Sequence, residues 1–182
     1  MQRNIGFISF RLSGTDGVSL ETKKWADIFE RNNCNCFYFG GELDAPPQQA
    51  FVAPEAHFTH PEVKELYRMA FGNARRPREL TTGLHKYREI LKDALYEFVR
   101  KFHIDVLVPE NAITIPLNIS LGMAITEFVA ETGIKTIAHH HDFFWERKRF
   151  LRNCVWDYLN QCYPPHLNAI HHVVINSSGA NQ

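Results

Sequence analysis

The sequence predicts an open, Rossmann-like α/β domain in which a parallel sheet is flanked by helices. Short apolar runs alternate with longer amphipathic segments along the chain, and strands that alternate with helices pair in parallel. The apolar runs are nearly continuous, as in strands that are buried on both faces. A length of 182 residues suits a single domain, so we expect residues 1–182 to form one unit.

The N-terminal half contains two strands and two helices in the order strand, helix, strand, helix. Residues 5–10 form an apolar run that predicts a buried strand. A glycine-containing turn follows, and an amphipathic helix is expected from about residue 19 to residue 32, with Ser19 as its cap. Residues 34–39 predict the second strand. The stretch 42–60 holds three of the nine prolines and predicts a long loop before a helix over 61–71.

The C-terminal half continues the same alternation. Apolar residues recur every three or four positions over 80–102 and again over 117–132, which predicts two amphipathic helices. Short apolar runs predict strands over 105–108, 135–138 and 171–175. The aromatic and basic stretch 143–163 predicts one further helix.

Composition excludes several classes of protein. Twenty basic and 20 acidic residues give a formal charge of zero, so we expect no nucleic-acid partner. No segment has the roughly 18 uninterrupted apolar residues that a membrane span needs, and no signal peptide is visible ahead of the first strand. The four cysteines are too few and too unevenly spaced for a disulfide framework. Buried free thiols in a cytoplasmic protein are therefore expected.

Polar residues follow four of the predicted strands, at the edge where open parallel sheets bind ligands. The first strand leads to a turn that contains Gly14, Asp16 and Gly17. Glycine allows close approach of a ligand, and the N-terminus of the following helix would attract a phosphate. Glu110 and Asn111 follow the strand 105–108. The alternatives are an ordinary turn for the glycines and a helix cap for Glu110 and Asn111.

The run from His139 to Asp142 is the most unusual string in the chain. In an extended segment His139 and His141 share one side while His140 faces the other. Three interpretations stay open. The first is a buried imidazole bonded to backbone. The second is a metal site built on His139, His141 and Asp142, to which Glu110 could add a ligand. The third is an imidazole that hydrogen-bonds sugar hydroxyls or a developing charge.

Together these residues resemble family 4 glycosyltransferases. The strand, glycine-containing turn and helix at residues 5–18 resemble the opening of these enzymes. The segments 109–118 and 136–147 resemble a subset of them, with the string His-His-His-Asp-Phe-Phe-Trp-Glu-Arg as the most distinctive part. The strand at 172–177 is similar to the one by which such chains approach the region between their two domains.

The resemblance implies a retaining enzyme of the two-domain GT-B architecture, of which this chain is the N-terminal, acceptor-side half. It implies a nucleotide-sugar donor held mainly by a C-terminal domain, a sugar acceptor held by this half, and no cofactor or metal. It places one histidine of the run 139–141 near the reacting sugar without deciding which, and His139, the nearest to the strand, is taken as the catalytic candidate. The substrate-binding candidates are Gly14, Asp16, Gly17, Glu110, Asn111, His141 and Asp142.

The chain departs from the family because the donor-binding half and its paired glutamates are absent. Glu89 and Glu97 have the matching spacing, but they lie in a predicted amphipathic helix, where we expect them to face solvent. The chain alone is therefore expected to transfer no sugar, and its exposed cleft face could drive self-association. The alternative functions are a nucleotide-binding or regulatory module and a metal-dependent hydrolase.

Overall fold

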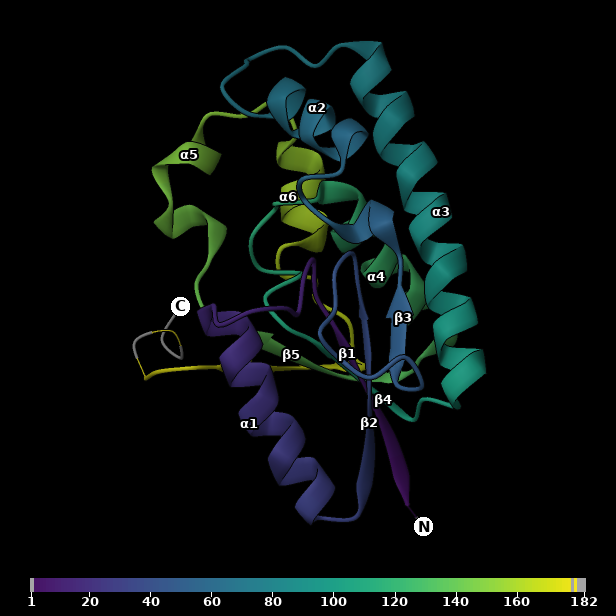
Figure 1. Cartoon of the computed structure of the whole chain (residues 1–182). Coiled ribbons are helices and arrows are strands. Elements are labelled where there is room, and N and C mark those ends of the chain that lie inside the picture. The colour runs from purple at the N-terminus through teal and green to yellow at the C-terminus, as the bar shows by residue number, and fades with distance from the viewer. Residues whose placement is uncertain (1, 178, 180–182) are drawn as a thin grey trace.

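The computed structural model describes residues 2–177 and 179, and in them one six-stranded sheet with helices on both faces (Figure 1). The strand order is β3-β2-β1-β4-β5-β6, and every pairing is parallel. This is the doubly wound order of Rossmann-type sheets, in which the winding direction reverses between β1 and β4. The predicted fold class is confirmed.

The strands are β1 (Arg3–Ile8), β2 (Cys34–Gly40), β3 (Ala50–Val52), β4 (Val106–Pro109), β5 (Lys135–His140) and β6 (Ile170–Val174). The main helices are α1 (Gly17–Arg31), α2 (Pro61–Ala70), α3 (Arg78–Phe102), α4 (Ile119–Thr132) and α6 (Trp156–Cys162). Shorter helical turns are η1 (Pro54–Ala56), η2 (Phe144–Glu146) and α5 (Lys148–Leu151).

The two faces of the sheet are covered unequally. The larger core lies on the face covered by α3, α4 and α6, and it includes Leu84, Leu107 and Phe128. The smaller core lies under α1, where Phe7, Cys36 and Val108 pack together with Trp25. The alternation of strand side chains assigns every second residue to each face. The same alternation separates neighbouring histidines of β5.

Helix α1 begins earlier than the sequence predicts, and Ser19 is not its cap. Asp16 is the N-cap, and its carboxylate accepts hydrogen bonds from the backbone N–H groups of Val18 and Ser19. Asp is at least as good an N-cap as Ser, and the bonded carboxylate also faces the positive end of the helix dipole. Helix α3 ends at His103 in the left-handed region, and Glu89 and Glu97 on it are exposed as predicted.

Two predictions of local structure are wrong. Residues 143–163 do not form one helix, because the Asn153 side chain accepts from Val155 N and donates to Phe150 O, which separates α5 from α6. The stretch 42–60 is not wholly irregular, since β3 pairs with β2 inside it. A strand of three residues is too short to show an alternating pattern.

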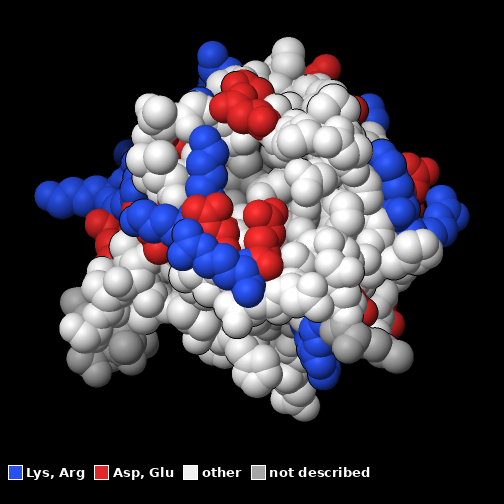
Figure 2. All heavy atoms as spheres, turned by 60° about the horizontal axis from the view of Figure 1, so that its bottom comes forward, with Lys and Arg blue, Asp and Glu red and all other residues white. Residues whose placement is uncertain are grey.

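Other sequence expectations concern the surface and the thiols. Acidic and basic side chains lie interspersed on the face shown in Figure 2, rather than gathered into one basic area. In the described part of the chain, none of the helices is long and apolar enough to cross a membrane. Cys36 and Cys162 are buried free thiols, whereas Cys34 and Cys154 are partly exposed.

Candidate functional site

The candidate site lies at the carboxyl ends of β4 and β5, beside the point where the sheet reverses its winding direction. Glu110 follows β4 directly and bridges to His139 of β5 in parallel register. The Glu110 N–H donates to Ile8 O of β1, and the Asn111 N–H donates to His139 O. Backbone bonds thus place three strand ends next to one another.

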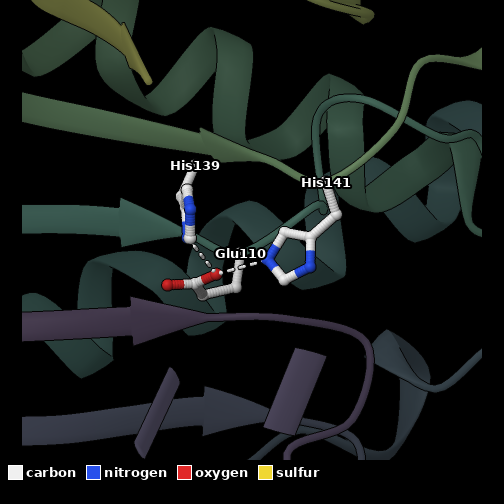
Figure 3. Close-up of side chains that lie close together, drawn as sticks. All are labelled: Glu110, His139 and His141. Carbon is white, nitrogen blue, oxygen red and sulfur yellow. Dashed lines mark hydrogen bonds and ion pairs between the residues drawn. The ribbon is translucent and has the colours of Figure 1, made fainter. Parts of the chain in front are cut away.

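Glu110 lies between His139 and His141 and contacts both imidazoles (Figure 3). Its Oε2 is 2.8 Å from His139 Nδ1 and 3.2 Å from His141 Nε2. The carboxylate is fully buried, and its Oε1 has no hydrogen-bond partner among the described residues. A buried carboxylate that only accepts hydrogen bonds needs an N–H from each imidazole.

With the Glu110 carboxylate as acceptor, His139 donates through Nδ1 and His141 donates through Nε2. His139 Nε2 and His141 Nδ1 are then the ring nitrogens that remain for a ligand. The His139 ring stacks on Trp25 of α1 with centroids 4.3 Å apart, and the residue is only 2% exposed. The side chain of His141 is 14% exposed and is the more accessible of the two.

Asn111 connects the cluster of Glu110, His139 and His141 to the loop after β5. Its backbone is in the left-handed region with φ of 57°, a conformation that Asn tolerates better than most residues. Asn111 Nδ2 donates to Asp142 Oδ1 at 3.1 Å, and Asn111 Oδ1 accepts from the His141 N–H at 3.2 Å. Asp142 also pairs with Arg147. Asn111 thus holds His141 and Asp142 in place relative to Glu110.

His140 faces the opposite side of β5, as the extended pattern predicts. Its Nδ1 is hydrogen-bonded to the Thr114 hydroxyl, and its Nε2 is 2.8 Å from His172 Nδ1 on β6. Burial lowers the pKa of His140 to about 3, with further lowering by the neighbouring His172. Desolvation also lowers the pKa of His172. Both rings are consequently neutral at pH 7.

The turn after β1 uses its N–H groups internally. Asp16 caps α1, and its carboxylate also pairs with Arg11 at 3.0 Å. The Gly14 N–H donates to Asp44 Oδ2, and Gly17 is the first residue of α1. Burial raises the pKa of Asp16 less than its hydrogen bonds with Ser19 and Arg11 lower it, so the pKa is below its ordinary value. The carboxylates of Asp44 and Asp16 thus accept from the N–H groups of Gly14, Val18 and Ser19.

Asp16 and Asn111 face one common cavity, whereas Gly14 and Gly17 are not among its lining residues. This cavity, of about 160 Å³, lies between the ends of β1 and β4, and Ser9, Arg11 and Phe58 also line it. His141 and Asp142 line a second cavity, of about 80 Å³, at the ends of β5 and β6. The predicted residues therefore flank two neighbouring hollows of the same sheet edge.

The Glu110 cluster is also the group of residues best arranged to share a cation. One ligand atom each from Glu110, His139 and His141 lies within 4.8 Å of the others. Three protein ligands and an open position are typical of catalytic zinc sites. The predicted metal set was His139, His141 and Asp142, with Glu110 as a further ligand. The structure brings Glu110 to the two histidines, whereas Asp142 is engaged by Asn111 and Arg147.

Sequence reasoning missed three partners of the histidines, namely Trp25, Thr114 and His172. Trp25 lies on the apolar face of α1, where it packs against the smaller core. The pairing of Ala138 with His172 in the β5–β6 register puts His140 and His172 on the same face. No local pattern reveals this pairing, because register between distant strands is a tertiary property.

Comparison with known proteins relates the chain to glycosyltransferases. It is 34% identical to the mannosylglucosylglycerate synthase of Petrotoga mobilis over 179 residues, which are 95% of this chain and 40% of that enzyme. It is 29% identical to the mannosylglucosylglycerate synthase of Thermotoga maritima over 183 residues, with the same coverage. The chain thus spans about 40% of the length of these curated relatives. No protein-family model matches it.

Solved structures show a weaker likeness. An alpha-glucosyltransferase in complex with UDP and a 13-mer DNA containing an HMU base aligns with 93% of this chain and 37% of its own, with a TM-score of 0.43 and 11% identity. An alpha-glucosyltransferase in complex with UDP and a 13-mer DNA containing a central A:G mismatch also aligns with a TM-score of 0.43 and 11% identity. At these values the likeness supports no conclusion about function.

Proposed function

We propose that this chain is the acceptor-side half of a retaining GT-B glycosyltransferase. The observation that carries the proposal is the 34% identity to a mannosylglucosylglycerate synthase over almost the whole chain, at only 40% of that enzyme's length. The Rossmann-type strand order and the polar edge at its reversal point fit such a half. The family 4 resemblance of the segment 136–147 points to the same class of enzyme.

The names of the relatives suggest the substrates. Their product contains mannosyl, glucosyl and glycerate groups, so we propose a glucosylated glycerate as acceptor and a nucleotide-activated mannose as donor. The donor would bind mainly to a second domain, and this chain alone would transfer no sugar. Neither a cofactor nor a metal is part of the proposal.

His141 is the imidazole that we place at the reacting sugar, in preference to His139. His139 was the expected catalytic residue, but it is 2% exposed and lies beneath Trp25. His141 lines a cavity and donates to Glu110 through Nε2, so that Nδ1 remains for a hydrogen bond with a sugar hydroxyl. Glu110 and His139 then act as positioning residues that hold the His141 ring.

Calorimetric titration of the purified chain tests this proposal. We expect a glucosylated glycerate to bind and a nucleotide-activated mannose to show no saturable binding. Tight binding of the nucleotide sugar, with none of the acceptor, would instead support a self-sufficient nucleotide-binding module. Sedimentation over a tenfold concentration range would show whether the cleft face drives self-association, which stays a prediction.

A metal-dependent hydrolase is the second candidate, and the Glu110, His139 and His141 cluster favours it. Metal analysis of the chain purified without chelators separates the two functions. One equivalent of zinc or iron, lost in a Glu110→Gln variant, would favour the hydrolase. A metal-free chain that binds the acceptor would favour the glycosyltransferase.

A further inference from the structure

The largest cavity found in the described part of the chain is separate from the Glu110 cluster and lies across β5 from it. Its volume is about 550 Å³, within the range of pockets that bind small molecules. It is bounded by η2, α6, the segment between α6 and β6, and the ends of β5 and β6. The lining residues are His140, Phe143, Phe144, Trp145, Asn160, Tyr163, Pro164, His166, His172, Val174 and Gly179.

The chemistry of the lining selects against an anion. Among the described lining residues there is no Lys, Arg, Asp or Glu. His140 and His172 bond to each other, and His140 is also bonded to Thr114, so these imidazoles are already engaged inside the protein. Apart from the imidazole of His166, a phosphate or carboxylate would find no cationic partner among the described lining residues. The cavity therefore suits a neutral ligand.

One wall of the cavity is an aromatic surface that is held in place. Trp145 stacks on Phe143 with centroids 4.6 Å apart and planes within 7°, and it meets Phe144 edge-on at 5.1 Å. Trp145 is nevertheless 39% exposed. A fixed, partly open indole offers a flat apolar surface, which matches the face of a pyranose ring that carries C–H groups.

Polar groups also line the cavity. Asn160 of α6 and His166 are exposed lining residues, and neither forms a side-chain hydrogen bond with the described residues. An amide can donate and accept at once, as a pair of adjacent sugar hydroxyls requires. A cavity that combines an aromatic surface with such groups suits a pyranose, which has an apolar face and a polar rim.

The cavity also adjoins a smaller one that the histidine run lines. The smaller cavity of about 80 Å³ shares His140, Phe143, Val174 and Gly179 with it, and His141 and Asp142 also line that smaller cavity. We propose that the large cavity binds a neutral hexopyranosyl ring against Trp145 and Asn160, as the sugar of the acceptor, with the reacting hydroxyl directed towards His141. This inference rests on the proposed function and assigns its acceptor to a specific pocket.

Titration of the ¹⁵N-labelled chain with methyl α-D-glucopyranoside, followed by NMR, tests the assignment. We expect saturable shifts in the signals of residues that line the cavity, with a dissociation constant in the millimolar range, as for other small single-ring ligands. Trp145→Ala should weaken binding about tenfold, since it removes the stacking surface. Asn160→Ala should weaken it about fivefold by removing a hydrogen-bonding group.

Trp156→Ala is the matched control, because Trp156 is a similarly exposed tryptophan, at 44%, that does not line the cavity. Its binding should be unchanged, and circular dichroism should show that all three variants are folded. Absence of saturable shifts, or equal binding by the Trp145 and Trp156 variants, would overturn the assignment. If the hexoside binds in this cavity but a two-domain enzyme transfers no sugar, the proposed function is refuted and the assignment of the cavity as a hexose site is kept. If the two-domain enzyme transfers sugar at a rate that Trp145→Ala does not change, the proposed function is kept and the assignment of the cavity is refuted.

Discussion

Replacement of Glu110 by Gln is the perturbation that most directly tests the histidine cluster. The buried carboxylate accepts from two imidazoles, at 2.8 and 3.2 Å. A hydrogen bond to a charged group contributes about 1.5–3 kcal/mol and a neutral one about 0.5–1.5 kcal/mol. Over two bonds the change to an amide should therefore lower the free energy of unfolding by about 2–3 kcal/mol. For a chain of this size the melting temperature would fall by about 4–12 °C.

Urea unfolding followed by circular dichroism measures the effect, with Glu97→Gln as the matched control. Glu97 is exposed on α3 and forms no hydrogen bond or ion pair with the described residues, so the same change there should shift stability by less than about 0.5 kcal/mol. Equal urea midpoints for Glu110→Gln and Glu97→Gln would show that the hydrogen bonds from the two imidazoles to the Glu110 carboxylate do not stabilise the fold.

Three further changes have defined outcomes. The pKa of His140 is lowered to about 3 from its ordinary value of 6.5, so the unfolded chain binds more protons between these pH values, and stability is lost as the pH falls through that window. In urea unfolding, the free energy of unfolding should fall by about 2 kcal/mol between pH 7 and pH 5, and His140→Gln should remove this fall. A variant whose free energy of unfolding depends on pH as in the original chain would contradict this. Gly122→Ala should lower the free energy of unfolding by about 1–3 kcal/mol, because the added Cβ would lie 2.3 Å from Cζ of the buried Tyr163. Gly17→Ala is the control and should be nearly neutral, since its Cβ would have nothing within 4 Å. Equal changes in melting temperature would show that Tyr163 moves aside without cost. Asp16→Ala should cost about 1 kcal/mol through loss of the α1 cap while Asp16→Asn retains most of it, and equal unfolding midpoints for the two would exclude a capping role.

The fold was predictable because the strand and helix patterns are strong and local. The apolar run that contains Leu107 and the period of α3 each identify an element without reference to the rest of the chain. The break between α5 and α6 was missed because the local hydrogen bonds of Asn153 to Phe150 and Val155 leave no mark in the apolar pattern of the segment 143–163. The bridge between Phe71 and Asn153 adds a tertiary contact there. The cap of α1 was missed because Ser19 competes with Asp16 for the same role in sequence.

Much of the candidate site followed from the sequence for a topological reason. Parallel strands end at one edge, so residues after β4 and β5 were expected to meet, and Glu110 does contact His139 and His141. The alternation of side chains along β5 correctly separated His140 from its neighbours. The contact with Trp25 could not be predicted, because it depends on how α1 lies across the sheet.

A hybrid enzyme tests whether this chain is the acceptor-side half of a glycosyltransferase. Residues 3–177 would replace the matched segment of the Petrotoga mobilis enzyme. We expect the hybrid to transfer mannose to a glucosylated glycerate, detected by mass spectrometry. We also expect His141→Ala to lower the rate about 100-fold or more and the exposed control His171→Ala to leave it unchanged. A folded hybrid that binds the nucleotide sugar but transfers none of it, or transfers equally well with His141→Ala, would show that the chain does not act as this half.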